Sequence, residues 1–191
     1  MTPRRRMEKS MRENEESLRR LPPWVRTPLY GAYPHGYLER VHAMFPDAAN
    51  VLHVFSGGLQ QMQAACLTWP GKMPTPRSME LVDIHGPEQG RYPTWQGDLH
   101  DMPAEWAGRF DLILADPPYS KDDAKLYDCP APNRGKIMRS LRRVCRPGGN
   151  LVWLDQVWPM HRKADWKTWG TIGLVRSTNH RMRLVSMFEA Q

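Results

Sequence analysis

The chain has 191 residues, of which 40% are hydrophobic and 25% charged, with a formal net charge of +7. This composition predicts one soluble globular domain, and no apolar run approaches the roughly 20 residues that cross a bilayer. The three cysteines lack CxxC spacing and the seven histidines are scattered, which argues against a metal site or a disulfide framework. The first residues lack the apolar stretch of a secretory signal, so we expect a cytoplasmic protein.

The net positive charge favours polyanionic partners. A basic surface attracts polyanions, and Lys and Arg contacts to phosphates are a general source of nucleic-acid affinity. Residues 1–24 form a polar arm of mixed charge, which is either a solvated tail or a phosphate-binding arm. We expect residues 25–191 to form a single domain, with nucleic acid as the partner that the charge favours and no membrane association.

Helical and extended patterns alternate along the rest of the chain. The expected elements, in order, are a helix at 35–45, a strand at 50–55, a helix at 59–67, strands at 79–84, 91–95 (weak) and 110–115, a helix at 134–144, and strands at 151–154, 172–176 and 182–188. Such alternation predicts βαβ units and a mainly parallel α/β sheet, here closed by an antiparallel strand pair. Ligands in these sheets bind at the carboxyl ends of the strands, so the turns after the strands form the candidate site.

The segment Asp116-Pro117-Pro118-Tyr119 ends the apolar run 110–115 and is the most informative feature of the chain. Two consecutive prolines fix two φ angles and remove two backbone donors, which predicts an extended corner after the strand. A planar heterocycle with an amino group matches this corner. Its amine would donate to Asp116 and to the Pro117 carbonyl, while its ring would stack on Tyr119. The alternative is a proline-rich turn without a chemical role.

Three earlier strand ends carry glycine or aspartate. The Ser-Gly-Gly turn at 56–58 opens a helix, and its glycines permit close backbone approach of a ligand. Asp83 ends the second strand, where a carboxylate can accept from both hydroxyls of a ribose or can serve as a turn residue. Gly97 and Asp98 follow the third strand, and a carboxylate there can accept from an adenine amino group.

The order of these motifs resembles the class I S-adenosylmethionine-dependent methyltransferases. The likeness is specific for the amino-methyltransferases with an Asp-Pro-Pro-Tyr motif, such as phage-type DNA adenine-N6 methyltransferases, and it covers roughly residues 30–190. The resemblance implies a Rossmann-like sheet of the class I methyltransferase type with a C-terminal antiparallel pair. It also implies S-adenosyl-L-methionine as the cofactor and no metal.

The resemblance assigns roles to individual residues. The catalytic corner is Asp116, Pro117, Pro118 and Tyr119, and the residues implied to bind the cofactor are Tyr33, Pro34, His53, Phe55, Ser56, Gly57, Gly58, Asp83, Ile84, Gly97, Asp98, Leu99 and Asp116. Two positions depart from the family pattern. His53 replaces an acidic residue near the cofactor ammonium, which leaves Asp116 or a backbone carbonyl for that role, and Leu59 replaces the last glycine of the turn.

The activity implied is methyl transfer to N6 of adenine in DNA. Two acceptors at the corner would draw the amine hydrogens out of the ring plane and localise the nitrogen lone pair towards the methyl group. A base in a duplex would first have to be flipped out. The alternatives are an amino-methyltransferase that acts on an RNA base or a protein glutamine, and a catalytically inactive methyltransferase-like subunit that binds nucleic acid.

The chain leaves no room for a separate target-recognition domain. Three segments could contact nucleic acid instead: the loop at 120–134, the basic helix at 134–146 and the basic, tryptophan-rich stretch at 161–169. For the helix, the alternative is an ordinary solvated face. For the last stretch, the alternative is an amphipathic helix that buries its tryptophans.

Overall fold

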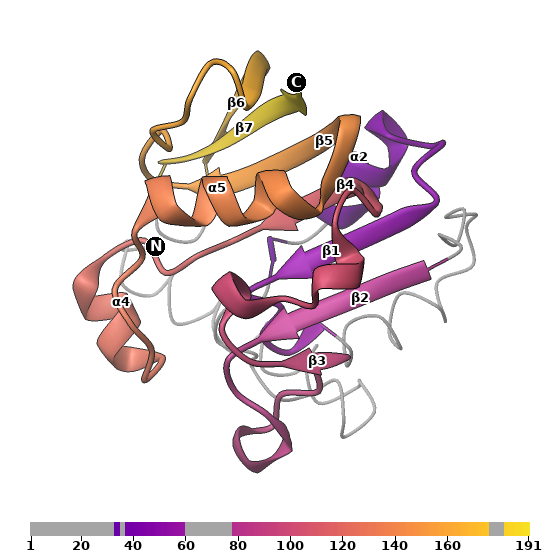
Figure 1. The fold of residues 1–191 in the computed structure, drawn as a ribbon. Coiled ribbons are helices and arrows are strands. Elements are labelled where there is room, and N and C mark those ends of the chain that lie inside the picture. The colour runs from indigo at the N-terminus through magenta and orange to yellow at the C-terminus, as the bar shows by residue number, and fades with distance from the viewer. Residues whose placement is uncertain (1–32, 35–36, 60–77, 176–181) are drawn as a thin grey trace, which may run out of the picture.

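A computed structural model describes residues 33–34, 37–59, 78–175 and 182–191 of the chain (Figure 1). The helices are α2 (Tyr37–Met44), α4 (Lys121–Leu126) and α5 (Arg134–Val144), with 3-10 turns η2 (Pro87–Gln89), η3 (Leu99–Asp101) and η4 (Ala104–Trp106). The strands are β1 (Asn50–Val54), β2 (Ser78–Asp83), β3 (Trp95–Gln96), β4 (Phe110–Ala115), β5 (Cys145–Asp155), β6 (Trp166–Val175) and β7 (Met182–Ala190). The expected arm at 1–24, and all of the expected helix at 59–67 except its first residue, lie outside the described residues.

The seven strands form one sheet in the order β3-β2-β1-β4-β5-β7-β6. Strands β1 to β5 pair in parallel, and β7 runs antiparallel to both of its neighbours. The centre of the sheet is the β1–β4 pair, in register from Val51↔Leu112 to Val54↔Ala115. Both the mainly parallel sheet and the C-terminal antiparallel pair are therefore confirmed.

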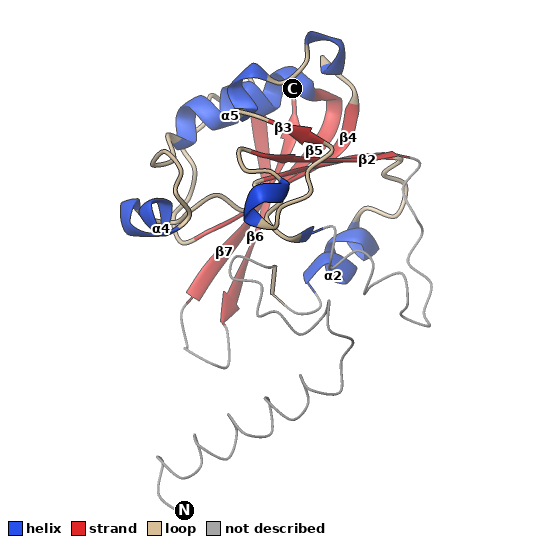
Figure 2. Ribbon diagram, turned by 90° about the horizontal axis from the view of Figure 1, so that it is seen from below, coloured by secondary structure: helices blue, strands red, loops and turns tan. Residues whose placement is uncertain are grey.

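Each face of the sheet is covered by a helix (Figure 2). On one face, α5 packs its apolar side against the even-numbered residues of β1 and the odd-numbered residues of β4 and β5, in a core that includes Trp153 and Phe188. On the other face, α2 contributes Tyr37 and Val41 to a second core. Because side chains alternate along a strand, His53 faces the α2 side. No helix among the described residues is long and apolar enough to span a bilayer.

The third strand differs from its expected span of 91–95. Only Trp95 and Gln96 pair with β2. Upstream, the Thr94 side-chain oxygen accepts the hydrogen bond of the Leu81 amide at 2.8 Å, and Pro93 has no amide hydrogen to offer. A side chain and a proline thus interrupt the backbone ladder, and the strand begins where they end.

The prediction of a possible amphipathic helix at 161–169 is wrong. Strand β6 begins at Trp166, whose ring is buried and whose indole nitrogen donates to the Met138 carbonyl at 3.1 Å. Trp158 and Trp169 remain 40% and 46% exposed, although each has an edge-on aromatic contact. Of Trp158, Trp166 and Trp169, only Trp166 is therefore buried, and the strand expected at 172–176 is longer at its start.

Two further differences concern the segments on either side of α5. Strand β5 begins earlier than the strand expected at 151–154 and contains a bulge: Phe110 pairs with Cys145 and Leu112 with Asn150, so the residues between them leave the ladder. The expected loop at 120–134 contains the short helix α4. The Ser120 hydroxyl caps that helix by accepting from the Asp123 amide at 3.0 Å.

Candidate active site

The predicted motifs gather at one edge of the sheet. The glycine turn follows β1, Asp83 ends β2, Gly97 and Asp98 follow β3, and the Asp116 corner follows β4. These strands are parallel neighbours, so their carboxyl ends meet there. This edge is where open α/β sheets bind ligands.

The glycine turn and Asp83 are joined directly. The Asp83 carboxylate accepts from the Gly57 amide at 2.7 Å and from the His85 amide at 3.0 Å. Phe55 and Gly57 have φ values of 59° and 54°, a left-handed conformation that costs free energy at Phe55. Asp83 therefore holds the turn in shape, the role of a turn residue, and retains lone pairs for further donors.

The turn after β3 is fixed by short-range contacts. Gly97 donates its amide hydrogen to the Asp83 carbonyl at 2.9 Å, and a side chain at this glycine would lie 2.8 Å from the Trp95 ring. Asp98 is exposed and caps η3 by accepting from the His100 amide. Leu99 is buried in the core, whereas Ile84 is 39% exposed. Of this group, Ile84 and Asp98 are accessible to a ligand.

Buried polar atoms without partners lie on the α2 side of the sheet. Tyr33 stacks on Tyr37 with ring centroids 5.1 Å apart, and its hydroxyl lies 3.5 Å from Nδ1 of the fully buried His53. Among the described residues, the Tyr37 hydroxyl, His53 Nε2 and the Ser56 hydroxyl have no hydrogen-bond partner. Burial lowers the pKa of His53 to about 3, so its imidazole is neutral. Pro34, next to Tyr33, is half-buried.

The corner after β4 is less exposed than a surface turn. Pro117 and Pro118 are buried, and Asp116 and Tyr119 are partly buried. The Tyr119 hydroxyl donates to Asp116 Oδ1 at 2.6 Å. Burial raises the pKa of Asp116 to about 7, against the lowering effects of the Tyr119 hydrogen bond and the Arg183 charge. Within the described residues, Asp116 Oδ2 accepts no hydrogen bond.

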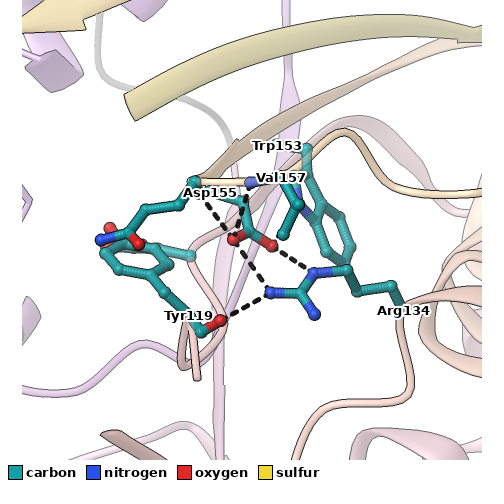
Figure 3. A network of polar contacts seen from close by, with 7 residues as sticks. Tyr119, Arg134, Trp153, Asp155 and Val157 are labelled. Atoms are coloured by element: carbon teal, nitrogen blue, oxygen red, sulfur yellow. Dashed lines mark hydrogen bonds and ion pairs between the residues drawn. The ribbon is translucent and has the colours of Figure 1, made fainter. Parts of the chain in front are cut away.

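The ion pair between Arg134 and the buried Asp155 stabilises the corner (Figure 3). The Arg134 guanidinium donates to both oxygens of Asp155, at 2.7 and 3.1 Å, and to the Tyr119 carbonyl at 2.9 Å. Asp155 is fully buried and also accepts from the Trp153 indole and the Gln156 amide. One guanidinium thus ties the start of α5 and the end of β5 to the catalytic candidate.

Arg183 lies on the other side of the corner. Its guanidinium carbon is 4.7 Å from the centre of the Tyr119 ring, the ring that we expected to stack on a substrate. The Arg183 charge therefore acts on the Asp116 carboxylate, while its buried Nε has no hydrogen-bond partner among the described residues.

Several residues of this site were not predicted. Asp155 had a usable signal, because it is a carboxylate at the end of an apolar strand, the pattern that identified Asp83 and Asp116. Arg134 and Tyr37 were indistinguishable from other helical residues. Arg183 lies within a strand pattern that gives no hint of its contact with Tyr119.

The basic residues of α5 are mostly engaged within the fold. Arg142 donates to the Cys145 and Gln191 carbonyls and Arg143 to the Met102 carbonyl. Arg146, which lies beyond α5 in β5, donates to Asp111. Lys136 and Arg139 are exposed. Only part of the expected basic face is thus unpaired. In the part of the chain that the structure describes, no three His, Cys, Asp or Glu side chains are grouped to hold a metal ion.

The chain matches no known family profile and no curated protein sequence. Its fold is similar to those of solved methyltransferases, all at low identity. TrmN from Thermus thermophilus matches with a TM-score of 0.60 and 14% identity over 88% of this chain, which spans about half (52%) of TrmN. The 1,6-didemethyltoxoflavin-N1-methyltransferase of Burkholderia thailandensis, solved with 1,6-didemethyltoxoflavin and S-adenosylhomocysteine, matches with a TM-score of 0.55 and 13% identity over 100% of this chain and 91% of that one.

A third match is the N-methyltransferase NodS from Bradyrhizobium japonicum WM9, solved with S-adenosylhomocysteine. Its TM-score is 0.52 at 14% identity, over 97% of both chains. These likenesses show the fold alone: a mostly parallel, Rossmann-like sheet with a C-terminal antiparallel pair, similar to the sheets of these solved methyltransferases.

Proposed function

We propose that the chain is an S-adenosylmethionine-dependent N-methyltransferase that acts on the exocyclic amino group of a nucleobase, with N6 of adenine in DNA as the favoured target. The observation that carries the proposal is the corner at Asp116, a partly buried carboxylate directly after the central strand β4, of which one oxygen accepts no hydrogen bond from the described residues. An amine donor is the group that such an acceptor binds.

The residues on the β1–β3 side fit the cofactor. Among the described residues, the Tyr37 hydroxyl, His53 Nε2 and the Ser56 hydroxyl are buried and have no hydrogen-bond partner, and polar groups of the cofactor would supply one. They would hold its methionine end, with the glycine turn beneath it, and Asp83 would bind the ribose. Since His53 is neutral, it would accept one hydrogen bond from the ammonium without charge compensation. When bound, the cofactor supplies a methyl group on a sulfonium.

The corner orients the acceptor amine. Asp116 Oδ2 and the Pro117 carbonyl would accept its two hydrogens, which turns the nitrogen lone pair out of the ring plane. Positive charge grows on the nitrogen in the transition state, so a carboxylate stabilises that state more than the ground state. Asp116 must be ionised to accept, and its pKa of about 7 allows it to take up a proton from the methylated amine.

DNA is proposed as the substrate on charge and on the motif. The net charge of +7 favours a polyanion, and an acidic first position in the corner motif resembles the DNA adenine enzymes. Two solved proteins of similar fold are an N1-methyltransferase and an N-methyltransferase, which supports nitrogen as the methyl acceptor. An RNA base is the second candidate on the same charge argument. The intact corner argues against an inactive subunit, which the departures at His53 and Leu59 would otherwise favour.

The test is a labelled methyl-transfer assay with matched substrates. The protein is incubated with S-adenosylmethionine and duplex DNA, single-stranded DNA or structured RNA of equal length, and the methylated nucleoside is identified by mass spectrometry. We expect N6-methyladenine from DNA. Exclusive labelling of RNA would overturn the choice of DNA. No labelling of any nucleic acid, by a folded protein that binds S-adenosylhomocysteine in calorimetry, would overturn the proposed substrate class.

A further inference from the structure

The strand order places Arg183 on the substrate side of the corner. The residues proposed to hold the cofactor lie on α2, on β1 and β2 and in the turn after β1, and β1, β2 and β3 lie on one side of β4. Arg183 is on β7, which lies on the other side of β4 beyond β5. Its neighbour Leu184 pairs with Asp155, so Arg183 lies level with the carboxyl end of β5 and with the corner. A side chain at this place is therefore nearer to the expected position of the methyl acceptor than to that of the cofactor.

The guanidinium of Arg183 has a buried donor, Nε, that no described residue accepts. It lies 4.7 Å over the Tyr119 ring, a contact that engages its charge but none of its hydrogen-bond donors with an acceptor. Nε is buried and unpartnered within the described residues. A buried donor without an acceptor destabilises the protein, and an acceptor on a bound ligand would remove that cost.

Asp116 and Arg183 together present an acceptor beside a donor. Tyr119 links them, because its hydroxyl binds Asp116 and its ring lies under Arg183. The complementary ligand edge is a donor beside an acceptor. Adenine has this edge, since its amino group is flanked by the ring nitrogens N1 and N7, both acceptors.

We propose that Arg183 is a specificity-determining residue that donates a hydrogen bond to the ring nitrogen next to the methylated amino group, so that Asp116 and Arg183 read one edge of the target base as a pair. The inference rests on the proposed function of the same site and adds the atom that selects the substrate. A planar guanidinium suits this contact better than an ammonium. Arg183→Lys therefore keeps the charge near Asp116 but not the recognition of the base edge.

The test compares three target bases: adenine, 1-deazaadenine and 7-deazaadenine, placed in the same oligonucleotide. Single-turnover methylation is measured for the wild type, Arg183→Lys and Arg183→Met, with Arg109→Met as the control. Arg109 lies just before β4, at the end opposite Asp116, and pairs with Glu80. This control removes the same charge far from the corner. Melting temperature and S-adenosylhomocysteine affinity show that each variant is folded and binds the cofactor product.

We expect one of the two deaza bases to lower kcat/KM of the wild type about 10- to 100-fold, the effect of a lost hydrogen bond that leaves a donor unpaired. The same base should bring no further loss in Arg183→Met or Arg183→Lys, while the control discriminates as the wild type does. Equal turnover of all three bases by the wild type would overturn the role of Arg183. The same holds if the deaza base lowers kcat/KM in the Arg183 variants by the same factor as in the wild type. Adenine left unmethylated by a wild type that binds S-adenosylhomocysteine would instead overturn the proposed substrate, and this inference with it.

Discussion

The Tyr119 hydroxyl donates a 2.6 Å hydrogen bond to Asp116, so the last residue of the corner motif stabilises the ionised form of the first. Burial acts in the opposite direction and raises the pKa of Asp116 to about 7. The sequence suggests four residues that each contact a substrate independently, but Tyr119 also acts on Asp116. Tyr119 controls how much of the carboxylate is available as an acceptor near neutral pH.

The first prediction concerns the pH dependence of turnover. Methylation by the wild type, measured as kcat/KM, should rise with pH through about 7, as Asp116 ionises. Tyr119→Phe removes a hydrogen bond that lowers the pKa of Asp116, so the pH profile of this variant should move to higher pH. The variant keeps the ring under Arg183. Superimposable profiles would show that Asp116 is not the group that titrates.

The second prediction concerns the pH dependence of stability, where Asp116 and His53 act in opposite directions. The folded-state pKa of Asp116 is raised to about 7, so its contribution to stability is present at low pH and is lost as pH rises towards 7. The folded-state pKa of His53 is lowered to about 3, so its contribution is present above the unfolded value of about 6.5 and is lost as pH falls. Between the pKa values of unfolded aspartate and unfolded histidine, Asp116 and His53 change the free energy of unfolding with pH in opposite directions, and these changes cancel.

Single variants should therefore expose the hidden slopes. For Asp116→Asn, the free energy of unfolding should fall on acidification below pH 6.5, relative to the wild type, by up to about 1.4 kcal/mol per pH unit. For His53→Gln it should rise relative to the wild type over the same range. Asp116→Asn should also be more stable than the wild type near pH 8, although it loses turnover. Urea denaturation at several pH values measures both effects, and curves parallel to the wild type would contradict them.

The third prediction separates two roles of Asp83. It accepts from the Gly57 and His85 amides, so Asp83→Ala should loosen the glycine turn. If it also binds the ribose, the affinity for S-adenosylhomocysteine should fall by roughly 1–3 kcal/mol. Calorimetry with S-adenosylhomocysteine and its 2′-deoxy analogue distinguishes the roles. The wild type should prefer the hydroxylated ligand, and Asp83→Ala should lose that preference; an unchanged preference leaves Asp83 as a turn residue only.

Much of the fold was predictable because its signals are local. The runs at 50–55 and 110–115 are apolar, lie in the sheet centre and end at special turns, so the strands β1 and β4 and the position of the Asp116 corner were correct. The capping pattern of Ser120 and Asp123 was also local, and it could have predicted α4. The third strand failed because a side chain, Thr94, replaced a backbone ladder bond.

The site was less predictable because its support is long-range. Arg134 and Asp155 are 21 residues apart, and neither position alone reveals that they share two hydrogen bonds. Arg183 contacts Tyr119 only because β7 inserts next to β5 in the sheet order. Sequence patterns identify which residues end a strand, but the contacts between strand ends depend on the order of the strands.

The last prediction tests the ion pair behind the corner. Arg134→Met leaves the fully buried Asp155 charge with only neutral donors, so the free energy of unfolding should fall by about 3 kcal/mol. Asp155→Asn should cost less, because the Arg134 side chain is 23% exposed and can be hydrated. Arg109→Met, which breaks an equally short but more exposed pair with Glu80, should cost about 1 kcal/mol or less.

Turnover should separate these variants more sharply than stability. Arg134 also holds the Tyr119 carbonyl, so both Arg134→Met and Arg134→Lys should lower kcat at temperatures where they are fully folded. A lysine ammonium lacks the planar fork that reaches Asp155 and that carbonyl together. S-adenosylhomocysteine affinity should remain near the wild-type value, because the corner and not the glycine turn is displaced. Wild-type kcat in folded Arg134→Met would mean that the ion pair stabilises the fold without positioning the corner.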